Sequence, residues 1–192
     1  MNSLLIEDAA LMLSVQDGGR SGYRRYGLPP SGPMDWWAFE CANRLVGNPF
    51  GAASLEVGFS SCDITLLGET LLAVCGAGYQ VRLNSRVIPL WMAFFGKRGD
   101  RLTIQKKPGG NWAYLAAVGG LQSPVWMGSR SAYPRAGLGK MLSAGDRVQL
   151  ADFAYNHRPL AGLCIPDSEK PSYAANTKLR VIPGPHQARF QE

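Results

Sequence analysis

Three acidic residues, Asp17, Asp35 and Glu56, stand where an acid or a base could work. The chain has only two histidines, so proton transfer would fall on carboxylates, tyrosines or lysines. Each of the three lies beside glycines or among apolar residues, where burial perturbs the pKa of a carboxyl group. A structural role is open for each as well. Asp35 can stabilise a helix start, Asp17 can cap a turn, and Glu56 can be an ordinary strand residue on a solvated face.

A second stretch with chemical potential is SRSAYPRAGLGK at 129–140. Its hydroxyls, arginines and small residues could form a nest for a carboxylate or phosphate, or merely a hydrogen-bonded loop between two strands. No G-x-S-x-G elbow, Walker P-loop or H-E-x-x-H segment occurs. The four cysteines are not spaced like zinc ligands, so we expect no metal and mostly buried, reduced thiols.

The segment SVQDGGRSGYRRYGLPPSGPMDWWAF at 14–39 allows three interpretations. Arg20, Arg24 and Arg25 alternate with tyrosines, which would suit single-stranded nucleic acid by charge and stacking. The segment could instead be a solvated linker, or a rigid loop that builds a binding site. We favour the rigid loop, with Asp17, Arg20 and Asp35 presented toward a small polar ligand, and we expect no nucleic acid.

The elements around these residues are predicted to be mostly β. One clear helix is expected at about 33–47, with Pro33 in its first turn and Ser31 as a possible cap. Its apolar positions predict one buried face: Met34, Trp37, Ala38, Cys41, Ala42, Leu45 and Val46. Residues 3–15 predict one or two strands. From Ala53 onward, short β-like runs follow: SLEVGF, CDITLL, TLLAVCG, YQVRLN, VIPLWMAFFG, RLTIQK and WAYLAAVGG.

Composition and charge narrow the class of protein. The 46% hydrophobic content supports a sizeable core, and the net charge of +6 suits an anionic ligand. The N-terminal segment lacks the basic region of a signal peptide, and no apolar run is long enough for a membrane helix. We therefore expect a cytoplasmic protein without a membrane partner.

The chain divides into three predicted parts. Residues 1–152 form a β-rich lobe, and the polar, proline-containing residues 153–177 form a linker or surface connection. Residues 178–192 begin a second, truncated lobe, because LRVIPG at 179–184 reads as the start of another strand.

Together these motifs resemble a known family. SVQDGGRSGYRRYGLPPSGPMDWWAFECANRLVGN, then SLEVGF, AYLAAVGG and GSRSAYPRAGLGKMLSAGD, are similar to the biotin-dependent carboxyltransferase superfamily. The match is to a type that includes the C subunit of bacterial 5-oxoprolinase, also called allophanate hydrolase subunit 2, and KipA. The resemblance implies cyclophilin-like β-barrel lobes. Family members continue into a second half, so we expect this chain alone to be inactive.

The family's motifs map onto particular positions. Its Q-D-x-G-R corresponds to Gln16, Asp17, Gly19 and Arg20, and its P-x-S-G-x-M-D to Pro29, Ser31, Gly32, Met34 and Asp35. The glycine loop corresponds to Gly128, Ser129, Arg130 and Ser131, followed by Ala132 where the family usually has threonine. We therefore expect Asp17, Asp35 and Glu56 as catalytic residues. The expected substrate-binding residues are Gln16, Arg20, Ser31, Gly32, Met34, Ser129, Arg130 and Ser131.

The resemblance implies the C subunit of an ATP-dependent 5-oxoprolinase, a hydrolase that opens the lactam 5-oxoproline to glutamate together with an A subunit and a KipI-like B subunit. ATP is then used by the complex, and no cofactor is expected on this chain. One alternative is carboxyl transfer from carboxybiotin to urea or a similar amide. No Met-Lys-Met segment is present, so biotin would arrive on another protein. A second alternative is a non-enzymatic, KipA-like antagonist of a kinase inhibitor.

Overall fold

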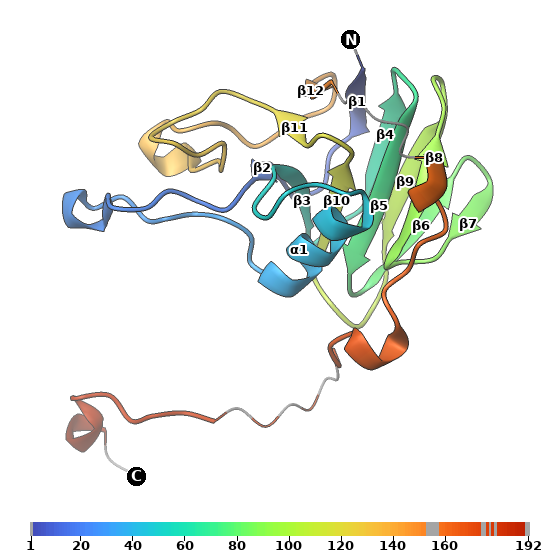
Figure 1. Cartoon of the computed structure of the whole chain (residues 1–192). Coiled ribbons are helices and arrows are strands. Elements are labelled where there is room, and N and C mark those ends of the chain that lie inside the picture. The colour runs from blue at the N-terminus through green and yellow to red at the C-terminus, as the bar shows by residue number, and fades with distance from the viewer. Residues whose placement is uncertain (1, 153–157, 174–175, 177, 179, 191–192) are drawn as a thin grey trace.

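The computed structural model describes residues 2–152, 158–173, 176, 178 and 180–190. Most of its regular structure is strand, arranged in two antiparallel sheets that face each other, with one α-helix outside them (Figure 1). The mostly β class and the single clear helix are confirmed for the described residues, and the predicted barrel-like lobe takes the form of two facing sheets.

The seven-stranded sheet has the order β11-β12-β1-β4-β9-β6-β7, and the five-stranded sheet has the order β2-β3-β10-β5-β8. The strands of the first are β11 (Leu121–Gln122), β12 (Arg147–Leu150), β1 (Ser3–Asp8), β4 (Cys62–Leu66), β9 (Arg101–Lys106), β6 (Tyr79–Leu83) and β7 (Arg86–Ile88). Those of the second are β2 (Met12–Gln16), β3 (Ser54–Gly58), β10 (Trp112–Ala117), β5 (Thr70–Gly76) and β8 (Met92–Gly96).

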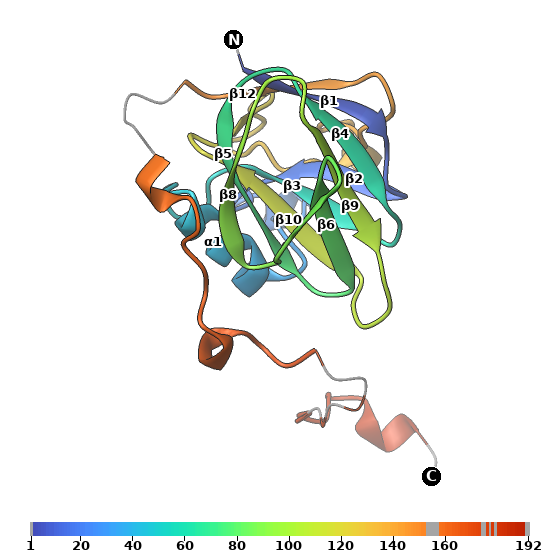
Figure 2. The same cartoon turned by 90° about the vertical axis from the view of Figure 1, so that its right-hand side faces the viewer.

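Burial along the strands reflects these layers. Residues of β4 alternate between buried and half-buried, as expected for a strand with one face toward solvent. Every residue of β5 is buried, because helix α1 (Trp36–Leu45) covers its outer face. Figures 1 and 2 show α1 outside the sheets, beside β10 and β5. One apolar core therefore lies between the sheets, and a second lies between the five-stranded sheet and α1.

Helix α1 is shorter than the predicted 33–47. It begins at Trp36 because the Asp35 side chain accepts a hydrogen bond from the Ala38 N–H and caps the first turn. The prediction of Ser31 as the helix cap is wrong. It has φ +59° and its hydroxyl binds Arg20 instead.

The predicted buried face of α1 is also partly wrong. Ala38, Cys41, Ala42, Leu45 and Val46 are buried as predicted. Met34 and Trp37 are exposed, since Met34 precedes the helix and Trp37 points away from the sheet, and Phe39 completes the buried stripe instead.

The run VIPLWMAFFG was predicted as one strand but contains two, β7 and β8, in different sheets. The break comes at Trp91, which has φ +65° and donates its indole N–H to the Gly76 carbonyl at 3.0 Å. An uninterrupted apolar run does not show where the chain crosses from one sheet to the other.

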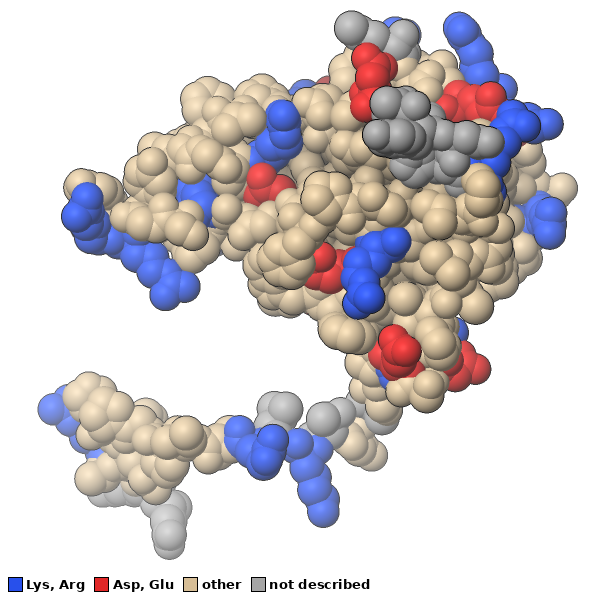
Figure 3. All heavy atoms as spheres, viewed as in Figure 1, with Lys and Arg blue, Asp and Glu red and all other residues tan. Residues whose placement is uncertain are grey.

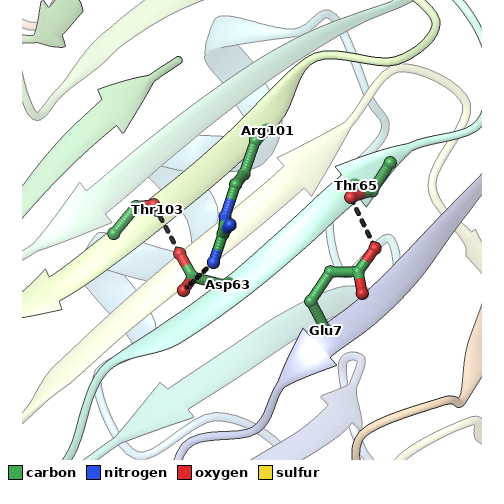
Figure 4. A network of polar contacts seen from close by, with 5 residues as sticks. All are labelled: Glu7, Asp63, Thr65, Arg101 and Thr103. Carbon is green, nitrogen blue, oxygen red and sulfur yellow. Dashed lines mark hydrogen bonds and ion pairs between the residues drawn. The ribbon is translucent and has the colours of Figure 1, made fainter. Parts of the chain in front are cut away.

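The outer face of the seven-stranded sheet carries paired polar side chains. Asp63 accepts from Arg101 at 2.7 Å and from the Thr103 hydroxyl, and Thr65 donates to Glu7 at 2.7 Å (Figure 4). Burial raises the pKa of Asp63, but the hydrogen bonds from Arg101 and Thr103 outweigh it and lower the pKa. This solvated face contains none of the predicted site residues.

Residues 158–173, which follow β12 in the chain, run over the surface and are attached to the edge of β8. There the Ala93 N–H donates to the Leu163 carbonyl at 2.8 Å and Cys164 forms a bridge with Met92. Residues 180–184 are exposed and form no strand, so the strand predicted at 179–184 is wrong for these residues. Residues 153–157, 174, 175 and 177 of the predicted linker lie outside the described residues, and the division into lobes stays a prediction.

The four cysteines are free thiols. Cys41, Cys62 and Cys75 are buried, as predicted, whereas Cys164 is exposed. Within the described residues, no helix has the length and apolar character needed to cross a membrane.

Candidate functional site

Three polar side chains lie side by side on the face of the five-stranded sheet that looks toward α1. Glu56 in β3 is directly opposite Ser14 in β2 and Tyr114 in β10. Because side chains alternate along a strand, this row stands on the opposite face from Leu13, Leu55 and Leu115, which fill the core between the sheets. Glu56 is 7% exposed and Tyr114 is fully buried. The alternative of a solvated strand position for Glu56 is therefore wrong.

The Glu56 carboxyl group is held by one of its two oxygens. Oε2 accepts the Tyr114 hydroxyl at 2.8 Å and the Met34 N–H at 2.9 Å. Burial raises the pKa of Glu56, and the two hydrogen bonds offset this only in part, so its pKa stays above the ordinary value. Oε1 has no hydrogen-bond partner among the described residues. Glu56 thus combines a shifted pKa with a free oxygen, as general acid–base chemistry requires.

Asp35 joins this group to the helix. Its N–H donates to the Tyr114 hydroxyl at 2.8 Å, Oδ1 caps the helix at the Ala38 N–H, and Oδ2 accepts the Tyr173 hydroxyl at 2.6 Å. Both oxygens are therefore occupied within the protein. The geometry favours the capping role of Asp35, and its catalytic role stays a prediction.

Asp17 connects two loops that project from the sheets, residues 17–32 and 123–142 (Figure 1). Oδ1 accepts the Ser129 hydroxyl at 2.5 Å, the Ser131 hydroxyl at 2.7 Å and the Gly19 N–H at 2.9 Å. Oδ2 accepts the Arg130 N–H at 2.6 Å. Burial raises the pKa of Asp17, but these four hydrogen bonds outweigh it and hold the pKa below the ordinary value. Asp17 is therefore an ionised, fully engaged carboxylate.

The first residues of the loop at 129–140 hold the carboxylate of Asp17, which agrees with the alternative of a hydrogen-bonded loop; binding of an external anion there stays a prediction. The side-chain contacts of Arg130 are separate. Its guanidinium donates to the Ser123 carbonyl and to Gln122 Oε1, the latter at 2.9 Å. Binding of an external carboxylate by Arg130 stays a prediction.

Arg20 is the second link between the loops. It is 2% exposed, and its guanidinium donates to the Ser31 hydroxyl at 2.7 Å and to the Ser131 carbonyl. Its Nε is buried and has no partner among the described residues. The close approach of the two halves of the first loop requires glycine at position 19, where φ is +76° and a Cβ would lie 2.7 Å from the Pro30 carbonyl oxygen.

Gln16 joins the loops to the sheet face. Its Oε1 accepts the Gly32 N–H at 3.2 Å, and its Nε2 donates to the Ser14 hydroxyl at 2.9 Å and the Ala132 carbonyl at 3.4 Å. All the residues expected at the site therefore meet in two adjacent clusters. We call these the loop clamp (Gln16, Asp17, Arg20, Ser31, Gly32, Ser129, Arg130 and Ser131) and the Glu56 cluster (Met34, Asp35, Glu56 and Tyr114). Their functional roles stay predictions.

Sequence reasoning missed Ser14, Tyr114 and Tyr173. The alternation of WAYLAAVGG places Tyr114 on the face opposite Leu115, but nothing in one sequence shows that β10 pairs with β3. Tyr173 comes from a segment expected to be a linker. Among the described residues, no group of three or more His, Cys, Asp or Glu side chains could hold a metal ion.

Comparison with known proteins decides the family. A family model described as "Carboxyltransferase domain, subdomain A and B" matches residues 26–192. The chain belongs to the carboxyltransferase-domain family. The C subunit of the Escherichia coli 5-oxoprolinase is 30% identical over 191 residues, which is 97% of this chain and 59% of that protein. The Saccharomyces cerevisiae urea amidolyase is 34% identical over 184 residues, 90% of this chain and 10% of that protein.

Solved structures agree with this carboxyltransferase-domain assignment. The crystal structure of the Kluyveromyces lactis urea carboxylase superposes with a TM-score of 0.78 at 32% identity, covering 91% of this chain and 16% of that one. The present chain thus spans less than two thirds of the length of these relatives. The resemblance inferred from the sequence motifs is confirmed at the level of the family.

Proposed function

We propose that this carboxyltransferase-domain chain is the C-type component of an ATP-dependent 5-oxoprolinase that opens the lactam to glutamate. The support is the similarity to the C subunit of the Escherichia coli 5-oxoprolinase over 97% of this chain. The name of that relative describes one component of a larger enzyme, and we propose homologues of the A and B subunits as partners here.

The observation that carries the proposal is the Glu56 cluster. Lactam opening adds water to the carbonyl carbon and breaks the C–N bond, and the leaving nitrogen must gain a proton. A carboxyl group with a raised pKa is protonated in a larger fraction of molecules than an ordinary glutamate, so it more often has a proton to donate. The free Oε1 of Glu56 is the atom available for that transfer, because Oε2 is held by Tyr114 and Met34.

In this proposal the rest of the network positions Glu56. Tyr114 is buried and its hydroxyl donates to Glu56 while accepting from the Asp35 N–H, so it keeps the carboxyl group in one orientation. The loop clamp joins the two projecting loops to each other through Asp17 and Arg20. ATP, consumed by the complex, supplies the driving force for opening a stable amide ring.

The test is 5-oxoproline-dependent ATP turnover by this chain combined with homologous A and B subunits. The Glu56→Gln variant should lower kcat roughly 10²–10⁴-fold with a small change in KM, the loss typical of a missing acid–base group. Glu7→Gln, an exposed glutamate on the outer sheet face, is the matched control and should turn over normally. A complex that hydrolyses no ATP with 5-oxoproline would refute the function. Normal turnover by Glu56→Gln would refute the role of Glu56.

A second function, carboxyl transfer between carboxybiotin and urea or a similar amide, is favoured by the similarity to yeast urea amidolyase and urea carboxylase. Calorimetric binding of free biotin, and urea-dependent loss of carboxybiotin, would support it. The absence of both from a complex that hydrolyses ATP with 5-oxoproline would exclude it.

A further inference from the structure

A cavity of about 280 Å³ lies under the projecting loop 123–142, away from the Glu56 cluster. It opens where β2 and β12, which belong to different sheets, are not hydrogen-bonded to each other. The loop bridges this gap by backbone hydrogen bonds from Ala132 to Val15 and from Leu142 to Leu13. The cavity is lined by Val15, Gln122, Ser123, Pro124, Trp126, Arg130, Gly139, Lys140, Leu142, Arg147 and Val148.

The floor and wall of the cavity are apolar. Val15 and Val148 are buried residues of the core between the sheets, and Leu142 packs against the same core. Trp126, 41% exposed, supplies an aromatic surface on the loop side. The volume is near the lower end of the ~300–1,000 Å³ typical of small-molecule pockets. The cavity therefore suits a small apolar body.

The polar lining is cationic. Lys140 is paired with Asp146 at 2.6 Å, whereas the Arg130 guanidinium donates, among the described residues, only to neutral acceptors, Gln122 and the Ser123 carbonyl. Arg147 has no ion pair among the described residues. Figure 3 shows Lys and Arg side chains distributed over the projecting loops. No acidic side chain of the described residues lines the cavity, so its charge is left for an anion.

We propose that this cavity is a binding site for a small organic acid with an apolar body, whose carboxylate meets Arg147. The apolar walls and the cationic lining select this class over a neutral or cationic molecule. The proposed contacts do not involve Glu56, although Arg130 of the loop clamp also lines the cavity.

Calorimetric titration with 4-phenylbutyrate and with its uncharged amide tests the proposal on the full chain. The acid should bind at least about tenfold more tightly than the amide. Arg147→Gln should weaken binding of the acid about tenfold and leave the amide unchanged, because one charge-assisted contact is worth about that factor. Arg86→Gln removes an equal charge from β7, at the opposite edge of the same sheet, and should have no effect.

Equal binding of acid and amide, no binding of the acid at millimolar concentration, or equal effects of Arg147→Gln and Arg86→Gln would each overturn the proposal.

Discussion

Replacing Asp17 by asparagine tests whether the loop clamp holds the two projecting loops in place. The carboxylate accepts four hydrogen bonds, three at Oδ1 and one at Oδ2. An asparagine must place its NH₂ group at one of these positions. If the NH₂ group takes the place of Oδ2, it faces the Arg130 N–H, and if it takes the place of Oδ1, it faces the Gly19 N–H. In either orientation at least one backbone donor loses its acceptor.

The cost follows from these contacts. A hydrogen bond to a charged group contributes about 1.5–3 kcal/mol and one between neutral groups about 0.5–1.5 kcal/mol. Losing one charged bond and weakening the other three by about 1–1.5 kcal/mol each gives about 4.5–7.5 kcal/mol. The partial exposure of Asp17 reduces this to about 3 kcal/mol. In a chain of this size, that free energy corresponds to a fall in Tm of about 6–12 °C.

Thermal unfolding followed by circular dichroism measures the change, with Asp63→Asn as the control. Asp63 is also a hydrogen-bonded carboxylate, but it lies on the solvated sheet face beside the exposed Arg101, so its loss should cost only about 0.2–1 kcal/mol (Figure 4). Hydrogen exchange should show faster exchange of the Gly19 and Arg130 amides in Asp17→Asn. Equal melting of the two variants, or unchanged protection of those amides, would refute the clamp.

The pH dependence of the same variant has a definite sign. The pKa of Asp17 is lower in the folded state, so its stabilisation is complete above the ordinary value of 3.8 and disappears as the pH falls through the folded value. The difference in stability between the wild type and Asp17→Asn should therefore shrink only below about pH 3.8. A difference that shrinks between about pH 7 and 5 would show that another group is responsible.

Three further predictions follow from the same network. Burial of Glu56 penalises its ionised form, so Glu56→Gln should unfold at an equal or higher temperature than the wild type at about pH 8. The two unfolding temperatures should converge as the pH falls below 4.5, the ordinary pKa of a glutamate. A variant that is less stable at about pH 8 would contradict this. Tyr114→Phe leaves the Asp35 N–H without its acceptor and should cost about 1–3 kcal/mol, or about 2–12 °C in Tm, whereas unchanged melting would mean that the hydrogen bond is not stabilising. A thiol reagent should modify the exposed Cys164 rapidly in the folded protein and reach the buried Cys41, Cys62 and Cys75 only on unfolding. Burial also raises the pKa of Cys62 to about 12, which disfavours its reactive thiolate. Rapid modification of two thiols in the folded protein would indicate an opened core.

Much of the fold follows from local pattern. The β-like runs become strands because alternation and β-branched residues report on burial within each strand. The local pattern does not predict features that depend on how the strands pair or where the helix begins. The break at Trp91 depends on the chain changing sheets, and the exposure of Met34 depends on Asp35 ending the loop one residue before the helix. Neither fact is contained in the periodicity of the residues themselves.

The sequence motifs single out residues that lie together in the fold, but they do not show the contacts between these residues. The glycine loop could have been a nest for a ligand or a hydrogen-bonded loop, and it binds the carboxylate of Asp17, which is more than 100 positions away in the chain. Tyr114 could be placed on a strand face but not beside Glu56, because that neighbour is set by strand order.

The opposite pKa shifts of the two carboxylates separate their roles. Asp17 faces four donors and is kept ionised, so it has no proton to give and no oxygen without a partner. Glu56 shares a buried sheet face with Tyr114, keeps one oxygen free of the described residues and has a raised pKa. If Asp17 is structural and Glu56 carries the proposed proton transfer, the two substitutions should have opposite effects. Asp17→Asn should lose stability, and Glu56→Gln should lose turnover while its stability holds. If the two variants show the same loss, the distinction between loop clamp and Glu56 cluster is wrong.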